Sequence, residues 1–276
     1  MSGAPSDTAL FAALVEALRP ALAEIVVVGG WAQRLFRLHD KAVSRTGSPL
    51  MTLDVDVALG ESRPSGEVDL AKRLHAGGFS AELRGDHRPP VARYRPTAGG
   101  GFYVEFLTPL RGGGERRSGA RDVTCEIAGV SAQKLRYLDF LLVAPIAVEL
   151  QPSEQFPLSE RALVRLPNPA GYIAQKLLIH GKRTRAGKAK DIAYLFDAVE
   201  IFGEGLASFG TTWIDEVEPT LHANARKRLA RAGDDLFGAV TDDIREAAAV
   251  LGDAGRSVEA ETIRSVCREG LRRIFG

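Results

Sequence analysis

Residues 52–59 read TLDVDVAL, and this stretch decides the fold. Its apolar side chains alternate with two carboxylates, Asp54 and Asp56. Because successive side chains of a strand point to opposite faces, the alternation predicts a β-strand with both aspartates on one face. The opposite face, which we expect to be buried in a core, would consist of Leu53, Val55, Val57 and Leu59.

The two carboxylates predict a metal site. Two residues apart on a strand, Asp54 and Asp56 have side chains whose bases lie about 6–7 Å apart. Ionised carboxylates this close repel each other unless a positive charge sits between them. Divalent magnesium suits such a gap, because it takes oxygen ligands and leaves part of its shell to water or phosphates. The alternative is a solvent-facing stretch of an amphipathic strand.

The segment upstream predicts a phosphate site. Residues 24–30, EIVVVGG, form a β-branched run that ends at Gly29 and Gly30, and residues 31–40, WAQRLFRLHD, have helical spacing. A strand that leads through glycines into a helix presents backbone N–H groups and the helix dipole at one place. Glycines also allow a ligand to approach the backbone closely. The alternative is an ordinary turn.

A third acid stands in residues 101–109, GFYVEFLTP. Glu105 is expected on the polar face of an apolar strand, opposite Val104 and Phe106. It could add a ligand to the carboxylate pair, or it could be an exposed strand residue.

The remaining pattern predicts two domains. The first, residues 1–166, mixes strands and helices, and the second, residues 167–276, is helical. The first adds helices over 7–22, with Asp7 as N-cap, and 67–76, and strands near 79–84, 91–95, 102–107 and 122–127. The second adds helices over 169–181, 188–202, 211–231, 236–251 and 257–274. The fold class is therefore α+β, a mixed sheet with flanking helices followed by an all-helical C-terminal domain.

Two segments of the first domain have no assigned element. Residues 111–121, RGGGERRSGAR, are glycine- and arginine-rich and predict a mobile loop. Residues 41–51, KAVSRTGSPLM, are either an insertion or an ordered substrate loop.

Basic residues gather in the helical half. Lys176 and Arg183 are seven residues apart, so they share a helix face if the helix continues that far. Lys176 either reaches inward toward a phosphate or snorkels at the core edge. Asp191 is expected to open the next helix, where an acid favours the N-terminus. Basic clusters at 182–190, 111–121 and 225–231 could touch RNA or could simply be solvated.

Composition excludes several classes of protein. Lys and Arg total 36 against 35 Asp and Glu, so the net charge of +1 does not indicate a dedicated polyanion binder. The cysteines, Cys125 and Cys267, show no metal-ligand spacing and suit a reducing cytoplasm. The N-terminus lacks the pattern of a secretory signal, and the longest apolar run, 140–148, is too short to span a membrane. The sequence also lacks the HxxxH and HExxH spacings of zinc sites, the GxSxG motif and the Walker motif. We expect a soluble cytoplasmic protein.

The joint pattern resembles a known fold. A strand, a Gly-Gly turn and a helix, then an hDhDh strand and a later acid, is similar to the nucleotidyltransferase fold of the polymerase-β type. VVGGWAQRL…TLDVDVAL looks like the signature of its small bacterial members, which include antibiotic nucleotidyltransferases and AbiEii-type toxins. Residues 166–200, with KRTRAGKAKDIAYLFD, are similar to the run that follows the catalytic core in AbiEii-type proteins.

This resemblance implies metal-dependent transfer of a nucleoside monophosphate from an NTP to a hydroxyl. Asp54 and Asp56 would hold Mg²⁺ or Mn²⁺ on the triphosphate, and Glu105 would help to hold a second ion that activates the acceptor. Gly29 and Gly30 would bind the departing phosphates. Lys176 and Arg183 would neutralise the charge of the leaving pyrophosphate.

The acceptor stays open between an RNA end such as tRNA, a protein hydroxyl and a small molecule, and the oligomeric state is not indicated. The alternative function is a non-catalytic nucleotide- or RNA-binding module, or a toxin–antitoxin component, that keeps the same fold.

Overall fold

The structure is a computed structural model that describes residues 5–43, 48–61, 68–114 and 122–276. It contains two compact units. The first comprises residues 1–31 and 52–166, and the second comprises residues 32–51 and 167–276. The predicted α+β class with a helical C-terminal part is confirmed. Within the described ranges, no helix is long and apolar enough to cross a membrane.

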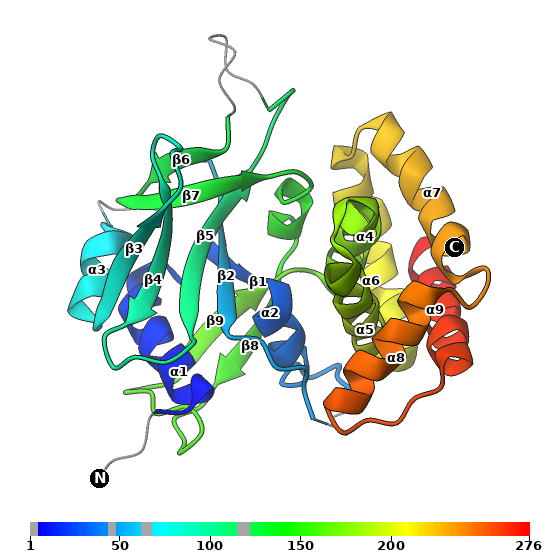
Figure 1. Cartoon of the computed structure of the whole chain (residues 1–276), viewed down its shortest axis with the longest axis horizontal. Helices are drawn as coiled ribbons and strands as arrows, with labels where there is room; N and C mark the ends of the chain where they lie inside the picture. The colour runs from blue at the N-terminus through cyan, green and yellow to red at the C-terminus, as the bar shows by residue number, and fades with distance from the viewer. Residues whose placement is uncertain (1–4, 44–47, 62–67, 115–121) are drawn as a thin grey trace. The chain divides into compact units, whose positions relative to one another are not determined.

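A mixed sheet organises the first unit (Figure 1). Its strand order is β1-β2-β5-β4-β3, with β7 joined to β5 and β6 joined to β7. Strand β5 runs parallel to β2 and to β7, and the other pairings are antiparallel. The bounds are β1 Ile25–Val28, β2 Asp54–Leu59, β3 Phe79–Arg84, β4 Val91–Pro96, β5 Tyr103–Pro109, β6 Thr124–Ile127 and β7 Val130–Leu135.

The predicted strand–glycine–helix segment is present. The β-branched run of β1, the end strand of this order, is buried along its whole length. Helix α2, Gly29–Phe36, follows without a connecting loop. In β2, Val55, Val57 and Leu59 are buried, whereas Leu53 precedes the strand and is 46% exposed. The predicted alternation therefore holds from Asp54 onward.

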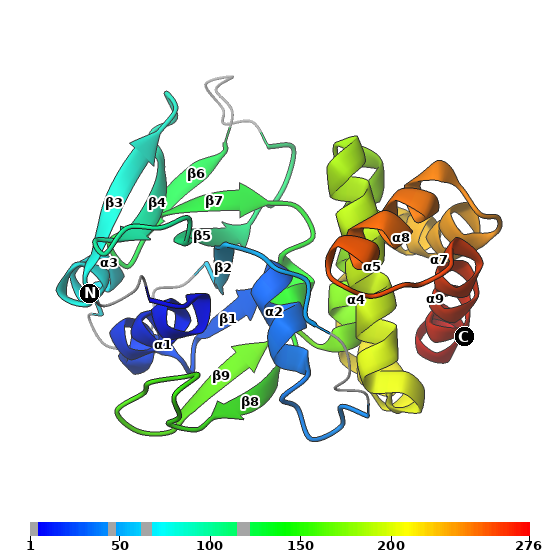
Figure 2. The ribbon, with the colours of Figure 1, turned by 60° about the horizontal axis from the view of Figure 1, so that its bottom comes forward.

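Helices and a small second sheet complete the first unit. The helices are α1 Asp7–Leu18 and α3 Leu70–Ala76, and β8 Ile146–Leu150 pairs with β9 Ala162–Leu166. Figure 2 shows β9 beside β1, with β8 on the other side of β9. Phe11 of α1 stacks on Trp31 with ring centroids 4.2 Å apart, which ties the first helix to α2. The N-cap of α1 is Ser6, whose hydroxyl accepts from the Ala9 N–H, and not Asp7 as expected.

The second unit is built from α2's end and the later helices. These are α4 Pro169–Ile179, α5 Arg185–Phe202, α6 Leu206–Thr212, α7 Ala223–Phe237, α8 Asp242–Asp253 and α9 Ala260–Phe275. Their core contains edge-to-face rings, with Phe36 5.3 Å from both Tyr172 and Phe202. A buried ionic cluster adds to it, because Asp197 accepts from Arg37 at 2.7 Å and from Arg256 at 2.6 Å.

Several predicted bounds were wrong for local reasons. The helix expected over 211–231 is interrupted, because Pro219 lies in a short 3₁₀ turn and α7 begins only at Ala223. Helix α5 begins at Arg185 rather than 188, since the Thr184 hydroxyl caps Gly187. Strands β7, β8 and β9 were not predicted. Residues 44–47 of the 41–51 segment and residues 115–121 of the predicted mobile loop lie outside the described residues.

Candidate active site

Strand register gathers the three predicted acids. Strand β2 pairs in parallel with β5 so that Asp56 lies opposite Glu105 and Asp54 lies opposite Tyr103. Side chains of directly opposed residues share one face of the sheet, with neighbouring strands about 4.8 Å apart. All three carboxylates are half-buried. The first unit therefore places Asp54, Asp56 and Glu105 on one face.

The glycine turn lies against the same carboxylates. Strand β1 pairs antiparallel with β2, and its last residue, Val28, lies opposite Asp56. The next residue, Gly29, has φ of +65°, a conformation that L side chains rarely adopt. A Cβ at Gly29 would lie 2.3 Å from Oδ2 of Asp56. Glycine is required here both by the backbone and by the carboxylate, and Gly30 follows inside the first turn of α2.

Each end of this face has polar neighbours. The Thr52 hydroxyl donates to Oδ1 of Asp54. Nε of Arg93 on β4 donates to Oε1 of Glu105 at 2.6 Å. The Arg93 guanidinium also lies 4.5 Å from the ring centroid of Tyr103. Burial, followed by the negative charge of Asp54, raises the pKa of the Tyr103 hydroxyl. The ring and the guanidinium therefore border the carboxylates on the side of β4.

The carboxylates fit a divalent ion as a pair. Among the described residues, no group of three or more His, Cys, Asp or Glu is placed to hold a metal ion. Glu105 is engaged in the ion pair with Arg93. Asp54 and Asp56 nevertheless supply what Mg²⁺ needs, since this ion is usually held by one or two carboxylates plus substrate phosphates. Because Gly29 has no Cβ, Oδ2 of Asp56 can lie close against the turn.

Lys176 and Arg183 are held together in the second unit by Asp191. Nζ of Lys176 lies 2.7 Å from Oδ1 of Asp191, and Nε of Arg183 lies 2.9 Å from Oδ2. The side chains of Lys176 and Asp191 are only 6% and 1% exposed, whereas that of Arg183 is 47% exposed. Asp191 was expected to open its helix, but it lies within α5.

The charge state of this cluster follows from its contacts. Burial alone would raise the pKa of Asp191, but Lys176 and Arg183 outweigh it and hold that pKa below its ordinary value. The Lys176 ammonium also lies 4.9 Å and 4.8 Å from the ring centroids of Tyr172 and Tyr194. Asp191 is therefore an ionised carboxylate held between Lys176 and Arg183. The assignment of Lys176 and Arg183 to phosphates stays a prediction.

Sequence reasoning missed the basic side of the site. Arg93 was placed in a strand but given no role, and Tyr103 and Thr52 were not considered. A signal was present, because residues 91–96, VARYRP, alternate and put Arg93 and Arg95 on the polar side of their strand. Which acid would meet Arg93 depended on a register that the sequence does not display.

Comparison with known proteins identifies a family. A family model described as nucleotidyltransferase matches residues 8–216, which is more than half of the 276-residue chain. A search of curated proteins finds no match. The matched range contains every residue assigned to the candidate site, namely Gly29, Gly30, Asp54, Asp56, Glu105, Lys176 and Arg183.

Proposed function

Because the chain belongs to the nucleotidyltransferase family, we propose that it transfers a nucleoside monophosphate from a nucleoside triphosphate to a hydroxyl-bearing acceptor. One observation carries the proposal. Asp54, Asp56 and Glu105 share one face of the sheet, and the Gly29 turn lies directly against Asp56. A carboxylate pair beside an N–H-bearing glycine turn joins a metal-ligand set to a phosphate site.

In this proposal Asp54 and Asp56 would hold Mg²⁺ or Mn²⁺, and Glu105 would join them in holding a second ion. Bound divalent ions would supply charge neutralisation for the triphosphate and Lewis-acid activation of the acceptor hydroxyl. Glu105 has first to give up its ion pair with Arg93. The incoming triphosphate offers Arg93 a replacement partner, because arginine binds phosphate oxygens through charge-assisted hydrogen bonds.

The chain's own groups would position the substrates. The backbone N–H groups of the Gly29–Gly30 turn would bind the β- and γ-phosphates, and the absence of a Cβ at Gly29 lets the Asp56 carboxylate lie beside this turn. The acceptor oxygen forms a bond to the α-phosphorus as the bond to the bridging oxygen breaks. Pyrophosphate departs, and the hydroxyl proton passes to a carboxylate of the site or to water.

Of the two proposed phosphate-binding cations, Arg183 is the more exposed. Its side chain is half-exposed and uses Nε for Asp191, so further N–H donors remain for a ligand. The Lys176 ammonium is buried against Asp191. We therefore propose that Lys176 acts on pyrophosphate departure through the ionised Asp191–Arg183 pair rather than by direct contact.

The acceptor is proposed only as a class. The resemblance to AbiEii-type and antibiotic nucleotidyltransferases supports an RNA end such as tRNA, a protein hydroxyl or a small molecule. The net charge of +1 disfavours an extended RNA surface.

A second candidate function is favoured by the Arg93–Glu105 ion pair. If this pair persists when nucleotide binds, the chain is a nucleotide- or RNA-binding module, or a toxin–antitoxin component, without turnover.

Transfer of label tests the proposal. Pure protein and a cell extract are incubated with each α-labelled NTP, and the labelled product is identified. Asp54→Asn and Asp56→Asn should each lower transfer below about a tenth of wild type, by analogy with the loss of a single oxyanion-hole donor, which costs about 10²–10³ in rate. Glu126→Ala, which removes an exposed carboxylate of β6, should not change it.

Two outcomes would reject the assignment. Transfer that survives in Asp56→Asn would remove the carboxylate from the site. Nucleotide binding of equal affinity with Mg²⁺ and with chelator, together with no labelled product, would favour the binding module.

A further inference from the structure

The second unit contains a pocket that the proposed transfer does not use. It lies between the end of α4, the helix α7 and the start of α8, and we call it the α7 pocket. Its volume is about 610 Å³, within the range of roughly 300–1,000 Å³ that is usual for small-molecule sites. All of its lining residues fall between Leu177 and Asp243, so it belongs to the helical unit alone.

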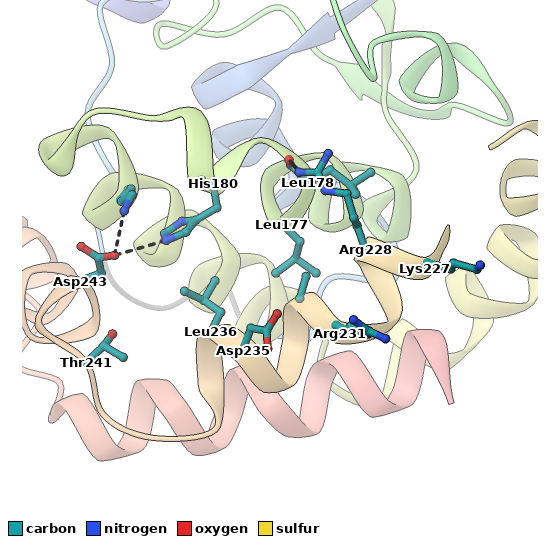
Figure 3. Close-up of a pocket in the computed structure, with 13 residues that line it drawn as sticks. Leu177, Leu178, His180, Lys227, Arg228, Arg231, Asp235, Leu236, Thr241 and Asp243 are labelled. Atoms are coloured by element: carbon teal, nitrogen blue, oxygen red, sulfur yellow. Dashed lines mark hydrogen bonds and ion pairs between the residues drawn. The ribbon is translucent and has the colours of Figure 1, made fainter. Parts of the chain in front are cut away.

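The pocket has an apolar middle and two polar ends. Figure 3 shows Leu177 and Leu236 near its centre, with His180 and Asp243 at one end and the cations of α7 at the other. Leu177 is buried and forms an apolar wall of the pocket. An apolar middle of this kind suits a ring or another carbon-rich group rather than a bare ion.

One end is rich in positive charge. Arg231 stands one turn from both Lys227 and Arg228 on α7, and like charges at such spacings destabilise a helix. Arg228 is fixed in place, because its guanidinium donates to the Leu178 carbonyl at 2.8 Å. Among the described residues, no ion pair is found for Lys227 or Arg231. A bound anion would relieve this repulsion.

The other end is held by an acid. Asp243 lies 3.4 Å from Nε2 of His180 and 3.6 Å from Nζ of Lys188. Burial lowers the pKa of His180, and Nε2 of its ring faces the Asp243 carboxylate. A carboxylate accepts several hydrogen bonds, so Asp243 can also accept from a ligand hydroxyl or amine.

The charge balance identifies the kind of ligand. Four lysines and arginines line the pocket against two aspartates, Asp235 and Asp243, which leaves an excess of positive charge. A ligand that fits has an anion at one end, an apolar ring in the middle and hydrogen-bond donors at the other end. From this arrangement we infer that the α7 pocket binds a nucleotide-sized organic phosphate, with its phosphate on Arg228 and Arg231.

Nucleic acid fits the pocket less well. RNA binding without sequence preference depends on an extended cationic track. Here three of the four cations stand at one end of a concave site that also contains two carboxylates, and the fourth, Lys188, lies beside Asp243. The inference is independent of the proposed transfer, since none of the lining residues was assigned to it.

Calorimetry with AMP tests the inference. The titrated protein is the full chain carrying Asp54→Asn and Asp56→Asn, in the presence of chelator, so that metal-dependent binding at the carboxylates is silenced. AMP should bind with a dissociation constant of about 1 mM or tighter. Adenosine, which lacks the anion, and inorganic phosphate, which lacks the ring, should each bind more weakly than AMP.

Two arginines of the same helix provide the matched variants. Arg231→Ala should weaken AMP binding about tenfold, the lower end of what a charge-assisted hydrogen bond supplies. Arg226→Ala removes an exposed arginine of α7 that does not line the pocket. The AMP dissociation constant should therefore stay within about twofold of the parent value. Melting temperatures of both variants should match that of the parent.

Three results would overturn the inference. One is the absence of AMP binding, and another is an equal loss of affinity in Arg231→Ala and Arg226→Ala. The third is a single-stranded oligonucleotide that binds more tightly than AMP and is weakened by both substitutions, which would make this helix face an open nucleic-acid surface.

Discussion

Replacing Lys176 by methionine separates a structural from a phosphate-binding role for this residue. The ammonium lies 2.7 Å from Asp191, and both side chains are almost fully buried. Methionine keeps the length and the apolar stem of lysine but removes the charge. Asp191 would then retain one partner, the half-exposed Arg183. We expect a marked loss of stability in the helical unit.

The size of the loss follows from the burial. Removing one partner of a buried ion pair commonly costs about 3–5 kcal/mol, because the remaining charge stays buried without compensation. Arg183 still screens Asp191, so we expect about 3 kcal/mol. At about 2–4 °C per kcal/mol, the melting temperature should fall by roughly 6–12 °C.

Thermal unfolding, followed by calorimetry and circular dichroism, measures this change. Lys182→Met is the matched control, since Lys182 is exposed and the same substitution there should cost less than about 0.5 kcal/mol. The double variant Lys176→Met/Asp191→Leu should regain most of the stability, because replacing both members of a buried pair by apolar groups is often neutral.

The opposite result would refute this reasoning. An unchanged melting temperature, combined with a transfer rate lowered about 10²–10³-fold, would place the Lys176 ammonium on the phosphates, as the sequence resemblance implied. A double variant as unstable as the single one would show that the ion pair is not the source of the loss.

Three further predictions concern the glycine turn, the Arg93 side chain beside Glu105, and the stability of the protein at acid pH. Gly29→Ala should reduce the transfer rate more than tenfold, because its Cβ would displace the Asp56 carboxylate and small misplacements in an active site cost about that much in rate. Gly78→Ala, with similar strain at φ +82° but no atom nearer than 3.7 Å, should lose stability and keep its activity. Arg93→Met should tighten Mn²⁺ binding about tenfold, since it removes the cation that competes for the third carboxylate, and unchanged affinity in calorimetry would contradict this. The depressed pKa of Asp191 contributes stability that is complete above its unfolded pKa of about 3.9 and is lost as pH falls through the folded value, so Asp191→Asn should flatten the acid limb of a plot of melting temperature against pH.

Local patterns predicted the first half of the candidate site well. The alternation of Asp54 and Asp56 with buried valines depends only on the two-residue period of a strand, and the β-branched run before Gly29 depends only on composition. Both signals lie within a few residues of the chain. The structure has the strand and the turn where they were expected.

Partners distant in the sequence could not be predicted in the same way. Glu105 was expected on a polar strand face, but its pairing with Arg93 depends on the register of β4 against β5. Lys176 was placed on a helix, yet its partner, Asp191, was assigned to a helix N-terminus because the Thr184 cap was not recognised. Strand β7 was not predicted, because its polar residues weaken the apolar pattern that indicates a strand.

The path of the chain has a consequence for any attempt to divide the protein. A cut after Leu166 would leave residues 32–51 on the wrong fragment, separated from the helices with which they cluster. Phe36 would lose its ring contacts, and Arg37 would lose Asp197. In the helical fragment, Tyr172 and Phe202 would line a cavity at the place that the Phe36 ring occupies in the whole chain. Recombination between relatives at this point would conserve the fold only if residues 32–51 were inherited together with the helical half.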